Sequence, residues 1–179
     1  MILPNNLICL DIETTDLDED VGSIVQLASI VVNKEFEQIR FRKFDMYIKP
    51  LNNHRNPEAM AVNKIDEEIL LHATSLEETL ILFESFCEND RMLASFGSCF
   101  DMPFLKRQYK KINRVWPFKH HIVDLKTIAI WELAQRDIES SSGLASIMKT
   151  LDIHSEGSAH NAMVDVKNAV NIIRHIKGR

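Results

Sequence analysis

The feature that most constrains this chain is an apolar segment, residues 7–15, that ends in two carboxylates. Its sequence, Leu-Ile-Cys-Leu-Asp-Ile-Glu-Thr-Thr, predicts a buried strand with acidic last residues. Side chains two apart in a strand point to the same face, so Asp11 and Glu13 share one side and Ile12 takes the other. Paired carboxylates in a half-buried place are costly, because desolvation and like-charge repulsion both oppose ionisation. A divalent cation would remove this cost; a solvated strand end followed by a turn is the alternative.

Length and composition limit the class of protein. The 179 residues, 45% of them hydrophobic, are enough for a single domain with a full core over residues 1–179. Cys9, Cys87 and Cys99 lie in apolar runs without paired spacing, so we expect buried thiols and a reducing compartment. The sequence has no evident signal peptide or membrane-spanning run, and we expect a cytoplasmic protein without a membrane partner. A formal charge of −5 argues against a protein that coats duplex nucleic acid.

Periodicity predicts an α/β fold with a mixed central sheet and helices on both faces. Ser75 and Glu78 form a capping box that begins the most clearly marked helix. We expect an antiparallel meander of three strands at the start of the chain, followed by alternating helices and strands. The strands are expected at residues 7–15, 24–32, 41–49, 92–96 and 122–124. The helices are expected to begin near residues 57, 75, 101, 125, 144 and 161.

Asp165 is informative because the face of its helix can be worked out. At about 100° per residue, Asp165 falls within the arc of apolar residues and so points inward. An acid in the first turn is also favoured by the helix dipole, but the dipole would favour it on any face. An unpaired buried Asp is rare, so we expect Asp165 to have a functional role. The apolar residues of this arc are Ala162, Val166, Ala169, Val170, Ile172, Ile173 and Ile176.

Asp101 and His160 each allow two interpretations. Asp101 follows a turn at Gly97 and precedes Pro103, which favours a helix N-cap. It would also lie beside Asp11 if the strands before the two residues were neighbours. His160 precedes the last helix and is expected on a loop, either as a solvated side chain or as a group that can reach the acids.

The order and spacing of Asp11-x-Glu13, Phe100–Asp101 and His160-x4-Asp165 resemble the three exonuclease motifs of the DEDD superfamily. The His five residues before the last Asp is similar to the DEDDh branch, which includes bacterial polymerase proofreading epsilon subunits, oligoribonuclease and RNase T. Residues 13–17 resemble the family's E-T-T-G-L, residues 62–65 its V-H-G-I, and Asp124–Leu125 its later D-T segment. Asp16, Gly97 and Asn161 depart from the usual Gly, Asn and Arg.

The resemblance implies an RNase H-like fold and release of nucleoside 5′-monophosphates from single-stranded 3′ ends of DNA or RNA. It also implies two divalent cations, Mg²⁺ or Mn²⁺, which prefer carboxylate oxygen. Asp11 would bridge both ions, Glu13 and Asp165 would hold the one near the attacking water, and Asp101 would hold the second. His160 would act as the general base, since imidazole titrates near pH 6.5. Thr14 and Leu17 would contact the terminal nucleotide, although Leu17 could instead pack the turn.

Several alternatives stay open. DNA is slightly favoured by the likeness to proofreading subunits, and processing of short RNA is the alternative. A noncatalytic nucleic-acid or polymerase-binding module on the same fold is the competing class, and a polymerase is one candidate partner. The basic run on the helix after Asp101 is typical of a solvated face, but it could also steer phosphates. The sequence does not indicate the oligomeric state.

Overall fold

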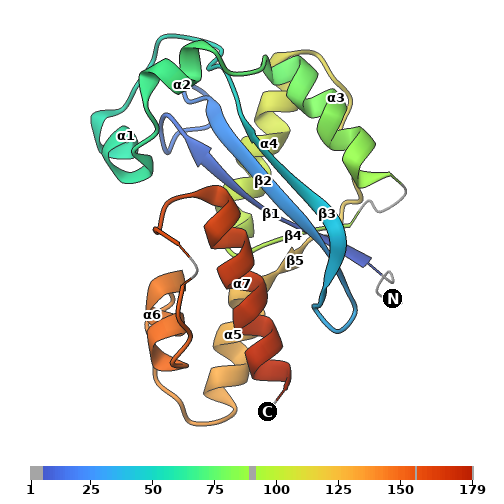
Figure 1. The fold of residues 1–179 in the computed structure, drawn as a ribbon, viewed down its shortest axis with the longest axis vertical. Helices are drawn as coiled ribbons and strands as arrows, with labels where there is room; N and C mark the ends of the chain where they lie inside the picture. Colours follow the sequence, from blue (N-terminus) through green and yellow to red (C-terminus); the bar gives the residue numbers. More distant parts are fainter. Residues whose placement is uncertain (1–5, 89–91, 156, 179) are drawn as a thin grey trace.

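The computed structural model describes residues 6–88, 92–155 and 157–178. A five-stranded mixed sheet, in the order β3-β2-β1-β4-β5, forms its centre (Figure 1). The strands are β1 (Asn6–Thr14), β2 (Ile24–Asn33), β3 (Gln38–Tyr47), β4 (Leu93–Ser95) and β5 (Val123–Asp124). The first three form the expected antiparallel meander, and β4 runs parallel to both β1 and β5. The third strand starts and ends earlier than expected, and Ile48 beyond it forms only an isolated bridge with Thr74.

Seven helices surround this sheet in the described residues. They are α1 (Pro57–Asn63), α2 (Glu67–Leu71), α3 (Leu76–Cys87), α4 (Ser98–Lys111), α5 (Leu125–Ala134), α6 (Leu144–Thr150) and α7 (Ala162–Lys177). Helices α5, α6 and α7 cover one face and α3 and α4 the other, as the expected fold class requires (Figure 1). Among the described residues, no helix has both the length and the hydrophobicity needed to cross a bilayer.

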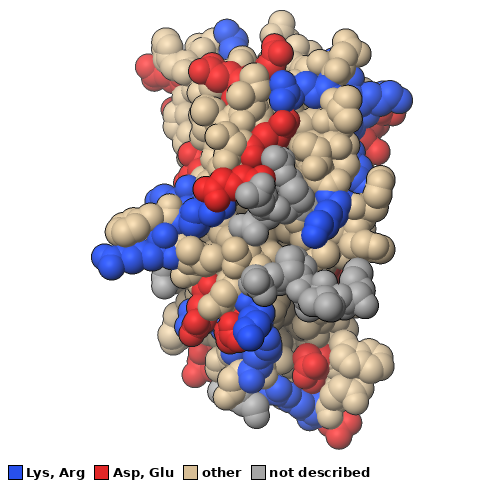
Figure 2. All heavy atoms as spheres, turned by 90° about the vertical axis from the view of Figure 1, so that its right-hand side faces the viewer, with Lys and Arg blue, Asp and Glu red and all other residues tan. Residues whose placement is uncertain are grey.

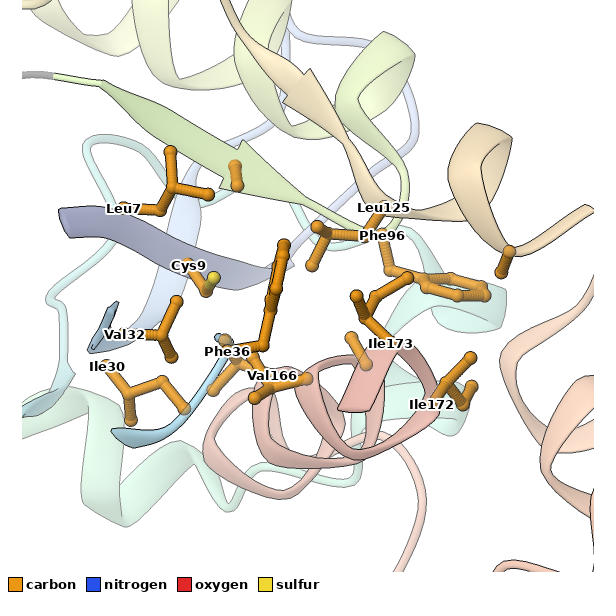
Figure 3. Packing of buried hydrophobic residues seen from close by; sticks show 14 of the residues in the cluster. Leu7, Cys9, Ile30, Val32, Phe36, Phe96, Leu125, Val166, Ile172 and Ile173 are labelled. Carbon is orange, nitrogen blue, oxygen red and sulfur yellow. The ribbon is translucent and has the colours of Figure 1, made fainter. Parts of the chain in front are cut away.

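Strand β1 supplies both hydrophobic cores, and its alternation decides the position of the acids. Leu7 and Cys9 belong to the core formed with α5, α6 and α7. Figure 3 shows them on the same side of the sheet as Leu125 and Val166. Ile8, Leu10 and Ile12 pack on the opposite face with α3 and α4. Since successive side chains of a strand alternate between faces, the next residues of the Leu7 row are acidic. Asp11 and Glu13 therefore stand on the face that α7 covers.

Local capping confirms some helix starts and corrects others. The Ser75 hydroxyl accepts the backbone N–H of Glu78 at 3.2 Å, as the capping box predicts. The expected N-cap role of Asp101 is wrong, because α4 already begins at Ser98, with Gly97 in the N-cap position. Asp124 accepts hydrogen bonds from both the N–H and the hydroxyl of Ser98, so it holds this early helix start in place. The expectation that Cys99 is buried is also wrong: as the second residue of α4 it faces solvent.

The surface on the β3 side carries both signs of charge. Figure 2 shows cationic and acidic side chains interspersed on this face, without a broad field of one sign. A protein that binds nucleic acid by neutralising many phosphates needs such a cationic field. Among the described residues on this face, no such field is present.

Candidate active site

Three carboxylates from β1 and α7 meet at one end of the sheet. Asp11, Glu13 and Asp165 each offer an oxygen atom, and these atoms lie within 4.8 Å of one another. The two residues of β1 come from its α7-facing row, and Asp165 comes from the first turn of α7. The structure thus brings together the two acids expected from strand periodicity and the one expected from helical periodicity.

Asp101 approaches the same place from α4. Strand β4 pairs with β1 in parallel, so their carboxyl ends meet at one edge, and α4 begins just after β4. The Asp101 side chain is 4% exposed, and its Oδ2 makes no hydrogen bond of ordinary geometry among the described residues, although Ser95 and the Gly97 backbone lie near enough to the carboxylate to oppose the rise of its pKa. A buried carboxylate oxygen without a partner is costly. It would be satisfied by a bound cation.

Burial raises the pKa values of all four acids, and the charges of neighbouring acids add to the rise for Asp11 and Glu13. Burial, followed by the charges of Asp101, Glu13 and Asp165, raises the pKa of Asp11 well above its usual range. Burial and the charges of Asp165 and Asp101 raise the pKa of Glu13 to about 7. Burial raises the pKa of Asp101 to about 7 as well. When these carboxylates are ionised, their negative charges lie close together in a buried place, and this is the cost that the raised pKa values reflect.

These residues fit divalent cations. The ligand atoms are carboxylate oxygens, which hard cations prefer, and no Cys or His belongs to this cluster in the described residues. The oxygens of Asp11, Glu13 and Asp165 are close enough together to ligate one cation, and Oδ2 of Asp101 makes no hydrogen bond that would compete with a cation. A bound cation would reverse the raised pKa values, since opposite charge favours the ionised carboxylate.

His160 lies on the loop before α7, as expected. Its backbone has a φ of 62°, in the left-handed region, and its N–H donates to Asp165 Oδ2 at 3.0 Å. Burial raises the pKa of Asp165, and this hydrogen bond opposes part of the rise. The His160 side chain is exposed and lines the same cavity as Asp165. The hydrogen bond between the two residues is made by the His160 backbone.

The two residues expected to bind substrate line a cavity of about 300 Å³ next to Glu13. Thr14 is buried and Leu17 is 74% exposed. The Leu17 side chain is thus largely free of contacts with the turn, and its contact with a nucleotide stays a prediction. Phe100 and Asn56 also line the cavity. Sequence reasoning missed Asn56, which bears no chemical motif; Phe100 was marked only as the neighbour of Asp101.

The loop that carries Leu17 is tied to residues 52–63. Asp16, where the related family usually has Gly, lies at hydrogen-bond distance from His54, with 2.6 Å between Asp16 Oδ2 and His54 Nε2. The hydrogen bond from His54, and then that from the Asp18 N–H, lower the pKa of Asp16 to about 2. Asn63 Nδ2 donates to the Thr14 carbonyl at 3.0 Å. These contacts connect the two segments whose residues line the cavity. They also give Asp16, which departs from the family pattern, a structural partner.

Three of the five cations in the basic run on and just after α4 make polar contacts within the protein. The run consists of Lys106, Arg107, Lys110, Lys111 and Arg114. Arg107 forms an ion pair with Asp20 at 2.6 Å, and Lys111 Nζ donates to the Gly22 carbonyl at 2.7 Å. Arg114 pairs with Glu84 at 2.9 Å. Two of these three cations hold the loop that carries Leu17 against α4. The run is therefore more than a solvated face.

Comparison with known proteins agrees with this geometry. The RNase T exonuclease family model matches residues 8–173. An oligoribonuclease from Xanthomonas oryzae pv. oryzae is 25% identical over 184 residues, which cover 97% of this chain and 88% of that protein.

Solved exonucleases share the fold. Cell-death related nuclease 4 superposes with a TM-score of 0.85 at 19% identity, over 97% of this chain and 64% of its own. E. coli exonuclease I in complex with a dA16 oligonucleotide superposes with a TM-score of 0.82 at 18% identity. That match covers 98% of this chain and 41% of exonuclease I. With the family match over most of its length, this chain belongs to the RNase T exonuclease family, within the DEDD class of 3′-to-5′ exonucleases.

Proposed function

We propose that this protein removes nucleoside 5′-monophosphates from single-stranded 3′ ends with the help of two divalent cations, Mg²⁺ or Mn²⁺. The observation that carries the proposal is the convergence of Asp11, Glu13 and Asp165, with the buried Asp101 close enough for its charge to act on Asp11 and Glu13. A site that had lost catalysis would have no physical reason to keep these charges buried. We also propose that residues 1–179 act as a single exonuclease domain.

Each acid has a proposed role. Asp11 lies among the other acids and would contact both cations. Glu13 and Asp165 would hold one of them with Asp11, and Asp101 would hold the other. When bound, the cations would supply positive charge to the attacking and leaving oxygens of an in-line displacement. The four carboxylates keep that charge in place on rigid elements.

His160 and the cavity beside Glu13 would complete the reaction site. The His160 imidazole, exposed on its loop beside Asp165, would accept the proton of the attacking water. The cavity of about 300 Å³ would hold one terminal nucleotide, with Thr14 at its sugar and Leu17 against its base. A cavity of this size is at the lower end of the range typical of small-molecule sites, which suits one nucleotide at a time.

The substrate is either RNA or DNA, and one observation favours each. The oligoribonuclease relative is matched over 88% of its own length, which favours short RNA oligomers. The resemblance of residues 13–17 and 62–65 to proofreading subunits favours DNA. We place short RNA first, because that relative is aligned almost end to end with this chain. DNA as the preferred substrate is the alternative, and a polymerase partner remains a prediction.

Digestion of matched DNA and RNA oligomers tests the proposal. With Mg²⁺ or Mn²⁺ we expect stepwise shortening from the 3′ end and release of mononucleotides, both abolished by EDTA. Asp11→Asn should lower the rate by at least about 10³-fold, because it removes the charge nearest to all other acids. Asp152→Asn, at an exposed acid outside the cluster, is the matched control and should leave the rate unchanged. Full activity of Asp11→Asn would contradict the proposed site, and no hydrolysis with either metal would favour the noncatalytic module.

A further inference from the structure

A buried glutamine on β2 connects the sheet to the start of α7. Gln26 is 1% exposed, and both ends of its amide are hydrogen-bonded. Its Oε1 accepts the backbone N–H of Ala162, the first residue of α7, at 3.2 Å. Its Nε2 donates to Oδ1 of Asp45 on β3 at 2.9 Å. One side chain thus joins two strands to the helix that carries Asp165.

The place of Gln26 in the sheet sets it beside the acids. It pairs with Glu13 in the antiparallel β1–β2 ladder and with Tyr47 in the β2–β3 ladder. Directly opposed residues of a ladder project their side chains on the same face. Gln26 and Glu13 therefore both face α7. The ladder is irregular immediately after this pair, between Glu13 and Thr14.

The start of α7 has few polar links to the sheet. Its other hydrogen bonds are local: Asn161 caps the N–H of Val164, and Asp165 accepts the N–H of His160. Among the hydrogen bonds of the described residues, the one between Ala162 and Gln26 links this first turn to the sheet. The free N–H groups at a helix start need such acceptors.

The chemistry of the position requires an amide held in one orientation. An amide offers one acceptor and one donor group, and its neighbours need one of each. If the amide were turned over, its NH₂ would face the Ala162 N–H and its oxygen would face the Asp45 carboxylate. Both contacts would be repulsive, so Asp45 selects the orientation in which Oε1 accepts from α7. A carboxylate at position 26 would repel Asp45 and add charge beside Glu13.

We infer that Gln26 is a positioning residue, oriented by Asp45, that fixes the start of α7 and so sets Asp165 and His160 relative to Asp11 and Glu13. This inference rests on the proposed function. Misplacement of a reacting group by about 1 Å can lower a rate by roughly 100-fold. The cavity that would hold the terminal nucleotide is lined from other elements, so its binding should change little.

The inference is tested by two single variants and a double variant that exchange the amide of Gln26 and the carboxylate of Asp45. We expect Gln26→Glu to lower kcat by about 10- to 100-fold with KM within about threefold, because the repelled side chain releases α7. Asp45→Asn alone should stay within about threefold of wild type, since the Asn oxygen can still accept from Gln26. The double variant Q26E/D45N should regain most of the lost kcat, because the new amide donates to the new carboxylate and the other carboxylate oxygen accepts from Ala162. The loss that remains would measure the charge added beside Glu13.

A control and a second readout separate positioning from loss of structure. Ser29→Ala removes a buried hydrogen bond of 2.8 Å from the same strand to the Cys9 carbonyl, without touching α7. It should lower the urea midpoint and leave kcat unchanged. If Gln26→Glu does not fold, Asp45→Ala, at an exposed position, replaces it and should lower kcat severalfold. The affinity for Mn²⁺ alone, measured by titration, should weaken in Gln26→Glu and recover in the double variant.

The outcomes distinguish the inference from the proposed function. An active wild type with Gln26→Glu equally active, or with no recovery in the double variant, would overturn the positioning role and leave the exonuclease proposal intact. An inactive wild type on every oligomer would refute the exonuclease proposal. In that case the Mn²⁺ titrations alone decide whether Gln26 positions the acids.

Discussion

Replacing Glu13 by glutamine removes one charge from the acid cluster and keeps the size of the side chain. Burial and the charges of Asp165 and Asp101 raise the pKa of Glu13 from 4.5 to about 7. One pKa unit corresponds to about 1.4 kcal/mol, so ionised Glu13 destabilises the metal-free protein by on the order of 3 kcal/mol. We expect Glu13→Gln to recover about 1–3 kcal/mol of this in EDTA at pH 8.

The pH dependence follows from the direction of the shift. Because the folded-state pKa of Glu13 is raised, the folded protein binds the proton more tightly than the unfolded chain does. The destabilisation is absent below about pH 4.5, grows as the pH rises, and is complete above about pH 7. Metal-free wild type should therefore lose stability between pH 5 and pH 8. Glu13→Gln should lose less, and the two proteins should agree near pH 5.

Added metal should reverse the order of stability. A ligand at 100 times its Kd stabilises a protein by about 2.7 kcal/mol, and wild type, with all four acids, should bind Mn²⁺ more tightly than Glu13→Gln. Urea unfolding followed by circular dichroism, with EDTA or Mn²⁺, measures both effects. Glu139→Gln, at an exposed site outside the cluster, is the matched control. The reasoning fails if Glu13→Gln in EDTA at pH 8 is no more stable than wild type, or if both proteins gain equally from Mn²⁺.

Three further substitutions test the loop before α7, the loop that carries Leu17, and the hydrophobic core. His160→Ala should keep Mn²⁺ affinity but lower kcat by about 10²–10⁴-fold, as loss of a general base does; unchanged kcat would exclude this role. Gly22→Ala would place its Cβ 2.8 Å from Phe104 Cζ and 2.9 Å from the Asp18 carbonyl oxygen. We expect it to lower stability by about 1–3 kcal/mol in urea and to raise KM through the Leu17 loop; unchanged values would show that the loop yields freely. Phe83→Ala should cost about 3–5 kcal/mol of unfolding free energy, because its fully buried ring contacts Phe44, Phe86 and Phe118; a loss under about 1 kcal/mol would contradict this packing.

Part of the site could be predicted because backbone geometry determines it locally. The strand repeat places Asp11 and Glu13 on one face wherever the strand lies, and the helical repeat turns Asp165 inward wherever its helix packs. The structure brings these three side chains together. The capping box at Ser75 is local in the same way, and its hydrogen bond forms as expected.

Other features depend on contacts between distant segments. The sequence around Asp101 favours an N-cap, but α4 begins earlier, at Ser98, and the parallel pairing of β4 with β1 brings Asp101 to the end of β1. Cys99 lies in an apolar run, yet its position on α4 turns it to solvent. The link between Gln26 and Ala162 joins residues 136 apart, and nothing near either residue indicates it.

The sequence by itself therefore determined the faces of the strand and helix that carry three of the acids, and the family to which their spacing belongs. Only the tertiary structure decided that Asp101 lies with these acids, that Asp16 pairs with His54, and that Gln26 anchors α7. The physical reason is that side-chain direction repeats with the local backbone, whereas convergence depends on strand order and on how helices cross the sheet.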